Sequence, residues 1–165
     1  MVRSASQSDP NLMGLDLSLT GTGVCVVSPD GEVVDQVQLG VPMTRKANVT
    51  QLTNRLLFIV NGILEVKTRS KVGRYAIEDY AYGAKGSQND LAELHGAVMV
   101  QMAIRFEMYA ERYSWSTLRK EILGRGNFPK DDILPALRER GMDLRTADIA
   151  DAYLVAERLR RRHHG

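Results

Sequence analysis

Three short β-type segments separated by turn signals open the apolar part of the chain. Apolar residues dominate 12–18 and 22–28, with a Thr-Gly pair between them. A Pro-Asp-Gly turn then precedes a valine-rich segment at 33–39. Strands joined by such tight turns pair in antiparallel fashion, so the fold must begin with a meander.

The rest of the chain alternates between helical and extended patterns. An apolar stripe of helical period predicts a helix that begins near Asn48 or Thr50 and runs to about Arg69. The segments that follow are predicted as a strand at 74–78, a helix at 90–112, a strand at 113–118, and helices at 130–140 and 146–162. This order predicts an α/β fold with a mixed sheet.

Length and composition indicate one globular domain. The 165 residues suffice for a single core, which we place in residues 12–165, behind a Ser-rich arm at 1–11. No apolar run approaches the length of a membrane span, and the first residues lack the apolar segment of a signal peptide. The single cysteine, Cys25, excludes an internal disulfide and a thiolate metal cluster, and we expect it to be buried. A cytoplasmic protein without membrane contact is expected.

Four carboxylates stand where surface acids are uncommon. Asp16 lies in the middle of an apolar strand, and Glu78 ends another. Asp148 and Asp151 are three residues apart, so they share one face of the last helix. Gathered anions repel unless a cation lies between them, and carboxylate oxygens suit Mg²⁺ or Mn²⁺. The four acids therefore predict a site for two metal ions that hydrolyses phosphodiester bonds.

Each acid also has a structural alternative. Asp148 could act as an N-terminal acid of its helix, Asp151 could be an exposed position, and Glu78 could belong to a turn. Asp16 is the hardest to explain in this way, because a lone charge within an apolar strand is costly.

The segment 116–130 is basic and contains two glycines, which let a backbone approach a phosphate. Its candidate DNA-binding residues are Arg119, Lys120, Arg125 and Lys130. A solvated basic loop is the alternative. The arginines at 158 and 160–162 could likewise follow a phosphate backbone or serve as a solubilising tail.

A Gly-rich loop with two tyrosines follows Glu78 directly. Tyr80 or Tyr82 could stack on an unpaired base, and Lys85 lies in the same loop. A tyrosine packed against the sheet edge is the alternative. We interpret Trp115, by contrast, as a core residue.

The sequence resembles the RuvC-like Holliday junction resolvases of the RNase H-like superfamily. The matching motifs, in the family's order, are GLDLSLTGTGVCVV, AIEDYAY, STLRKEILGRGNFPK and DIADAYLVAERL. The resemblance covers residues 13–158 and implies a five-stranded mixed sheet, with three antiparallel strands followed by parallel ones, flanked by helices. It implies that Asp16, Glu78, Asp148 and Asp151 form the catalytic tetrad. It places Arg119 and Lys130 on the family's basic positions near the scissile phosphate.

The expected activity is metal-dependent resolution of Holliday junctions and other branched DNA, with two Mg²⁺ ions per site and Mn²⁺ as a substitute. Two symmetric nicks require two active sites, so we expect a homodimer formed through the helix at 90–112. Leu17, Ser18 and Leu19 stand where the bacterial pattern has Pro-Gly-Ser, which favours a phage-type enzyme acting in the host cytoplasm. Nothing in the sequence identifies a branch-migration partner.

Three alternatives differ in class. Another RNase H-like nuclease, such as a ribosomal-RNA maturation factor, would share the core and the acids. An actin-like or sugar-kinase-like nucleotide-binding domain would share the first strand and its Gly turn, but it needs two domains. A non-catalytic DNA-binding module has no need for four acids.

Overall fold

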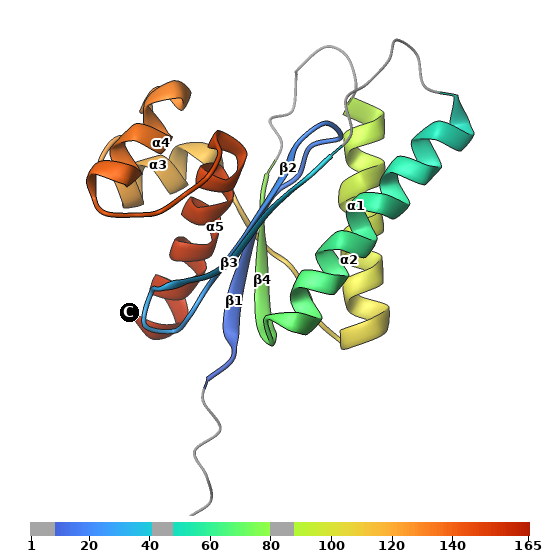
Figure 1. Ribbon diagram of the computed structural model, residues 1–165, viewed down its shortest axis with the longest axis horizontal. Helices are drawn as coiled ribbons and strands as arrows, with labels where there is room; N and C mark the ends of the chain where they lie inside the picture. Colours follow the sequence, from blue (N-terminus) through green and yellow to red (C-terminus); the bar gives the residue numbers. More distant parts are fainter. Residues whose placement is uncertain (1–8, 41–47, 80–87) are drawn as a thin grey trace, which may run out of the picture.

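Five strands form one mixed sheet in the computed structural model, which describes residues 9–40, 48–79 and 88–165 (Figure 1). The strands are β1 (Asn11–Asp16), β2 (Thr22–Val27), β3 (Val33–Leu39), β4 (Val72–Glu78) and β5 (Glu111–Tyr113). Their order in the sheet is β3-β2-β1-β4-β5. The first three pair antiparallel, while β4 runs parallel to β1 and β5 runs parallel to β4. The predicted sheet is confirmed. β1 begins at Asn11, which we had assigned to the N-terminal arm.

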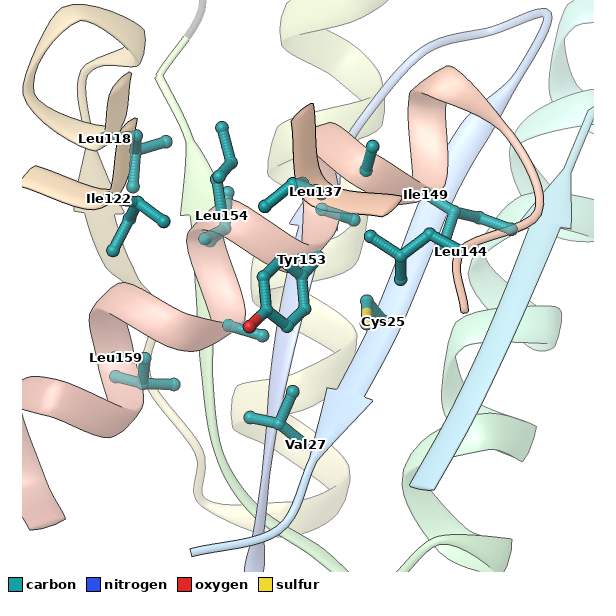
Figure 2. Close-up of a cluster of buried hydrophobic side chains, with 14 of the residues drawn as sticks. Cys25, Val27, Leu118, Ile122, Leu137, Leu144, Ile149, Tyr153, Leu154 and Leu159 are labelled. Carbon is teal, nitrogen blue, oxygen red and sulfur yellow. The ribbon is translucent and has the colours of Figure 1, made fainter. Parts of the chain in front are cut away.

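Helices cover both faces of this sheet (Figure 1). They are α1 (Val49–Arg69), α2 (Gln88–Phe106), α3 (Trp115–Leu123), α4 (Lys130–Glu139) and α5 (Ala147–His164). One core lies between the sheet and the α1–α2 pair, and a second lies beneath α5, α3 and α4 (Figure 2). Cys25 is buried in this second core, as predicted. No helix of the described residues is long and apolar enough to cross a bilayer.

The segment around Trp115 differs from the prediction. The long helix ends at Phe106 rather than near residue 112, and the last strand lies at 111–113 rather than at the predicted 113–118. Residues predicted as strand and basic loop instead form α3, because Ser114 caps its N-terminus and Gly124, with a φ of 93°, ends it. Trp115 is 39% exposed at the first position of α3 rather than in the core. The core positions of this helix are Leu118, Ile122 and Leu123.

Glycines in β1 and β2 let the backbone of α5 lie directly on the sheet. A Cβ on Gly14 would lie 2.1 Å from the Ala152 carbonyl oxygen and 2.4 Å from the Ala156 nitrogen. A Cβ on Gly23 would lie 2.0 Å from the Asp148 carbonyl oxygen. Neither position tolerates a side chain without moving the helix. This contact brings the first turns of α5 to the end of β1.

Replacing Gly14 with alanine tests this contact. The Gly14→Ala substitution should lower the free energy of unfolding by at least about 2 kcal/mol, because its methyl group would meet helix backbone rather than a flexible side chain. Gly96→Ala is the matched control: apart from its chain neighbours and the backbone of its own helix, no atom of the chain lies within 4 Å of its Cβ position in α2. That variant should equal the wild type or gain up to about 1 kcal/mol. Urea denaturation measures both, and equal stabilities for the two variants would contradict this packing.

Candidate active site

Asp16 and Glu78 end two adjacent parallel strands on the same face of the sheet. Leu15 of β1 pairs with Ile77 of β4, so the two acids that follow are also neighbours. Both apolar residues belong to the core under α1 and α2. Because side chains alternate along a strand, Asp16 and Glu78 point to the other face, where α5 lies. The strands thus deliver two carboxylates to the N-terminal end of that helix.

Asp148 and Asp151 reach the same place from α5. Thr146 caps the helix by accepting a hydrogen bond from the Ile149 nitrogen at 3.3 Å, and Asp148 lies in the first turn. Asp151 is 3% exposed, and its Oδ2 lies 3.0 Å from Nζ of Lys130. The structure therefore gathers the four predicted acids at one end of the sheet.

The pKa values of Asp16, Glu78 and Asp148 are raised by burial and by the charges of the neighbouring acids. Burial raises the pKa of Asp16 from 3.8 to about 7, and the negative charges of Asp151 and Asp148 add to the shift. Burial likewise raises the pKa of Glu78 from 4.5 to about 8, with further contributions from Asp16 and Asp151. The pKa of Asp148 is also raised by burial. Burial, reinforced by repulsion between the acids, therefore disfavours the charged forms of these groups.

The basic side chains nearest the acids are Arg119 and Lys130. Both lower the pKa values of Asp16 and Glu78, against the larger effect of burial. Burial alone would lower the pKa of Lys130, but Asp151 and the other acids outweigh it and raise that pKa. Arg119 donates a hydrogen bond from Nη1 to the Phe128 carbonyl oxygen at 2.9 Å. These two of the predicted DNA-binding residues therefore belong to the site.

The donor set fits a hard divalent cation in chemistry and in charge. Carboxylate oxygens are the ligands that Mg²⁺ and Mn²⁺ prefer, and a bound cation would offset the burial and the repulsion that raise the pKa values of Asp16 and Glu78. Within residues 9–40, 48–79 and 88–165, no three acidic, histidine or cysteine side chains already form a metal-binding group. Lys130 pairs with Asp151 instead. The carboxylates would have to adjust around an ion.

The remaining predicted DNA-binding residues lie elsewhere. Lys120 is exposed in the last turn of α3. Arg125 is exposed after that helix, and its guanidinium stacks on the Phe128 ring at 4.9 Å. The prediction for Tyr80, Tyr82 and Lys85 falls outside the described residues.

The arginines near the C-terminus form ion pairs within the protein. Arg160 and Arg161 both pair with Glu157 at 2.7 Å. Arg158 pairs with Glu121, and Arg162 with Glu111. In this structure these arginines pair with nearby acids. The expectations from the sequence, phosphate binding or a solubilising tail, did not include these ion pairs.

Two glutamines on β3 make contacts with the start of α5 that the sequence did not predict. Gln38 donates from Nε2 to Oδ2 of Asp148 at 2.7 Å, in space that a Cβ on Gly21 would fill. Gln36 donates to the Asp143 carbonyl oxygen at 2.7 Å and accepts from the Arg145 nitrogen at 3.0 Å. The edge strand thereby fixes the entry into α5 and orients one of its acids. Nothing in the sequence distinguishes these glutamines from ordinary exposed strand residues.

The profile of the family "Crossover junction endodeoxyribonuclease RuvC" matches residues 12–157. The chain belongs to the RuvC family. The predicted resemblance is confirmed, and with it the enzyme class. RuvC membership also argues against two of the alternatives raised from the sequence, an actin-like or sugar-kinase-like nucleotide-binding domain and a non-catalytic DNA-binding module.

Curated relatives agree with this RuvC assignment, and solved structures show a similar fold. A RuvC of Sulfurovum sp. is 24% identical over 88% of this chain and 92% of its own length, and one of Variovorax paradoxus is 26% identical over 88% and 81%. Thermus thermophilus RuvC has a similar fold, with a TM-score of 0.71 at 21% identity over 88% of this chain and 90% of that one. The yeast mitochondrial resolvase Ydc2 has a TM-score of 0.58 at 12% identity over 96% and 82%.

Neutralising Asp16 should stabilise the metal-free protein at alkaline pH. Because the folded protein keeps protons that the unfolded chain releases above pH 3.8, the free energy of unfolding falls as pH rises towards 7 and 8. At pH 8 in EDTA, Asp16→Asn should be about 1–3 kcal/mol more stable than the wild type. Near pH 3 the difference should vanish.

Urea denaturation across this pH range measures the effect. Glu93→Gln, an exposed change on α2, is the control and should show no pH-dependent difference. An Asp16→Asn variant no more stable than the wild type at pH 8 would show that the buried charge of Asp16 does not destabilise the folded protein.

Proposed function

We propose that this RuvC-family protein is a divalent-metal-dependent endonuclease that resolves Holliday junctions and other branched DNA. The observation that carries the proposal is the meeting of four carboxylates with Arg119 and Lys130 at one end of the sheet. The RuvC relatives are named as crossover junction endodeoxyribonucleases. One similar fold is that of Thermus thermophilus RuvC in complex with a Holliday junction substrate.

Nucleases of this family depend on divalent metal ions. In this proposal Asp16, Glu78, Asp148 and Asp151 would hold two Mg²⁺ ions, with Mn²⁺ as a substitute. When bound, such ions lower the pKa of the attacking water and stabilise the leaving 3′ oxygen, which gives 5′-phosphate and 3′-hydroxyl ends. Gln38 orients Asp148 through a neutral amide, so it fixes the carboxylate without neutralising its charge.

The basic residues would hold the DNA. Lys130 Nζ, 3.0 Å from Asp151, lies where it can reach a phosphate bound at the acids. Arg119 is fixed by the Phe128 carbonyl and offers a guanidinium to the same phosphate. Lys120 and Arg125 would contact the backbone farther along. Recognition of the branch by Tyr80 or Tyr82, with Lys85 beside them, stays part of the proposal, as does action in the cytoplasm of a bacterium or a phage host.

Cleavage of a four-way junction tests the proposed chemistry. Asp16→Asn and Asp151→Asn should each lower the cleavage rate by at least about 100-fold in Mg²⁺ while leaving junction binding largely intact, because binding depends mainly on cations. Asp132→Asn, an exposed acid on α4, is the control and should cut normally. Near wild-type cutting by Asp16→Asn would refute the mechanism. Faster cutting of structured RNA than of the junction would favour an RNA-maturation nuclease.

A homodimer through α2 is the second part of the proposal. The outer surface of the α1–α2 pair is apolar and open: Phe58 is 51% exposed, Val100 52% and Ile104 73%. A groove of about 290 Å³ runs between the helices, with Leu57 and Ala97 in its walls. A second copy seated there would supply the second active site that two symmetric nicks require.

Sedimentation of an α2 variant tests this interface. The wild type should sediment as a dimer, and Ile104→Asp should shift it to a monomer, because a charge would be buried in the contact. Val34→Asp on the edge strand β3, 49% exposed in the wild type, is the matched control and should remain dimeric. A wild-type monomer both free and on a junction would exclude the dimer.

A further inference from the structure

Trp115 is the only tryptophan of the chain and is exposed on α3, where it contacts Arg119. It occupies the first position of α3, and 39% of its surface is open to solvent. The other large exposed apolar side chains of the described residues lie on α1, on α2, on β3 and at Tyr109. An exposed aromatic on α3 has no role in the apolar core, which this helix contacts through Leu118 and Ile122.

The ring is linked directly to a residue of the proposed active site. The guanidinium carbon of Arg119 lies 4.6 Å from the centre of the Trp115 ring. Arg119 also donates to the Phe128 carbonyl, and Arg125 stacks on the Phe128 ring. Trp115 with Arg119 and Phe128 with Arg125 thus form two ring–guanidinium pairs, which the hydrogen bond from Arg119 to the Phe128 backbone carbonyl joins. We call these four residues the aromatic–arginine row.

Such a row has the chemistry of a surface for unstacked nucleotides. Guanidinium groups bind phosphates, while an aromatic face stacks on a base of any sequence. Paired bases inside a duplex are already stacked, so only a base freed at or near a branch could use the ring. Arg119 lies over the Trp115 ring, and the 39% of the residue that remains open to solvent can meet a base.

We propose that Trp115 stacks on a base of the DNA strand next to the phosphate that is cut. The inference rests on the proposed function and deepens it, because it assigns part of the recognition of branched DNA to a fixed helix, in addition to the segment that follows Glu78. Arg119 then binds the backbone while Trp115 binds the adjoining base. The combined contact favours a DNA strand whose bases are free to leave the base stack.

The fluorescence of the unmodified protein reports on this contact, because Trp115 is its only tryptophan. The wild type in EDTA, which prevents cleavage, is titrated with a four-way junction and with a blunt linear duplex. The junction should quench the tryptophan emission, and the duplex should do so much less. An unchanged emission on a junction whose binding is confirmed by anisotropy of a labelled strand would overturn the proposal.

Pairing protein variants with altered DNA identifies the partner base. Trp115→Ala should weaken junction binding about 5- to 150-fold, Trp115→Phe should retain most of the affinity, and Tyr109→Ala should change nothing. Abasic nucleotides are then placed one at a time beside the cleavage site. One of them should weaken binding of the wild type but not of Trp115→Ala, because the ring and the base act as a pair.

The outcomes of these experiments distinguish a failure of the stacking contact from a failure of the proposed nuclease function. Equal effects of every abasic position on the wild type and on Trp115→Ala would show that Trp115 only supports Arg119, and would overturn the stacking contact while cleavage persists. A wild-type protein that neither binds nor cuts junctions in Mg²⁺ would overturn the proposed function itself.

Discussion

The contact between α5 and the glycines of β1 and β2 is the constraint on which the rest of the structure depends. An ordinary helix lies against a sheet through side chains, whereas here Gly14 and Gly23 admit the helix backbone itself. Since Gly23 pairs with Asp16 across the strands, the same close approach that packs the core also fixes where Asp148 lies. The same helix–sheet contact therefore determines both the fold and the position of the site.

That close approach creates an electrostatic conflict. It brings Asp151 into a buried position beside Asp16 and Glu78, whose pKa values rise because burial and mutual repulsion both disfavour their charged forms. Lys130 and Arg119 relieve only part of the repulsion. A protein gains nothing in stability from such an arrangement, so the conflict is best understood as a requirement of chemistry that needs added positive charge.

The sequence predicts the parts of this structure that follow local rules. Apolar segments and turn signals locate the first four strands, and an acid within an apolar strand marks Asp16 as unusual. The prediction of a strand and loop at the α3 segment is wrong, although Ser114 and Gly124 carry the signals of a helix start and end. The incorrect assignment of Trp115 to the core has the same origin, because the residue is exposed at the start of this helix. Gln38 could not be foreseen, because its partner Asp148 is 110 residues away.

Metal binding without DNA tests most directly the claim that strand and helix acids form one site. Calorimetric titration with Mn²⁺ compares the wild type with Asp16→Asn, Asp151→Asn and the double variant. Each single change should remove most of the Mn²⁺ affinity, and the double variant should lose little more, because the two acids serve one site. Wild-type affinity in both single variants, or losses that simply add, would contradict this claim.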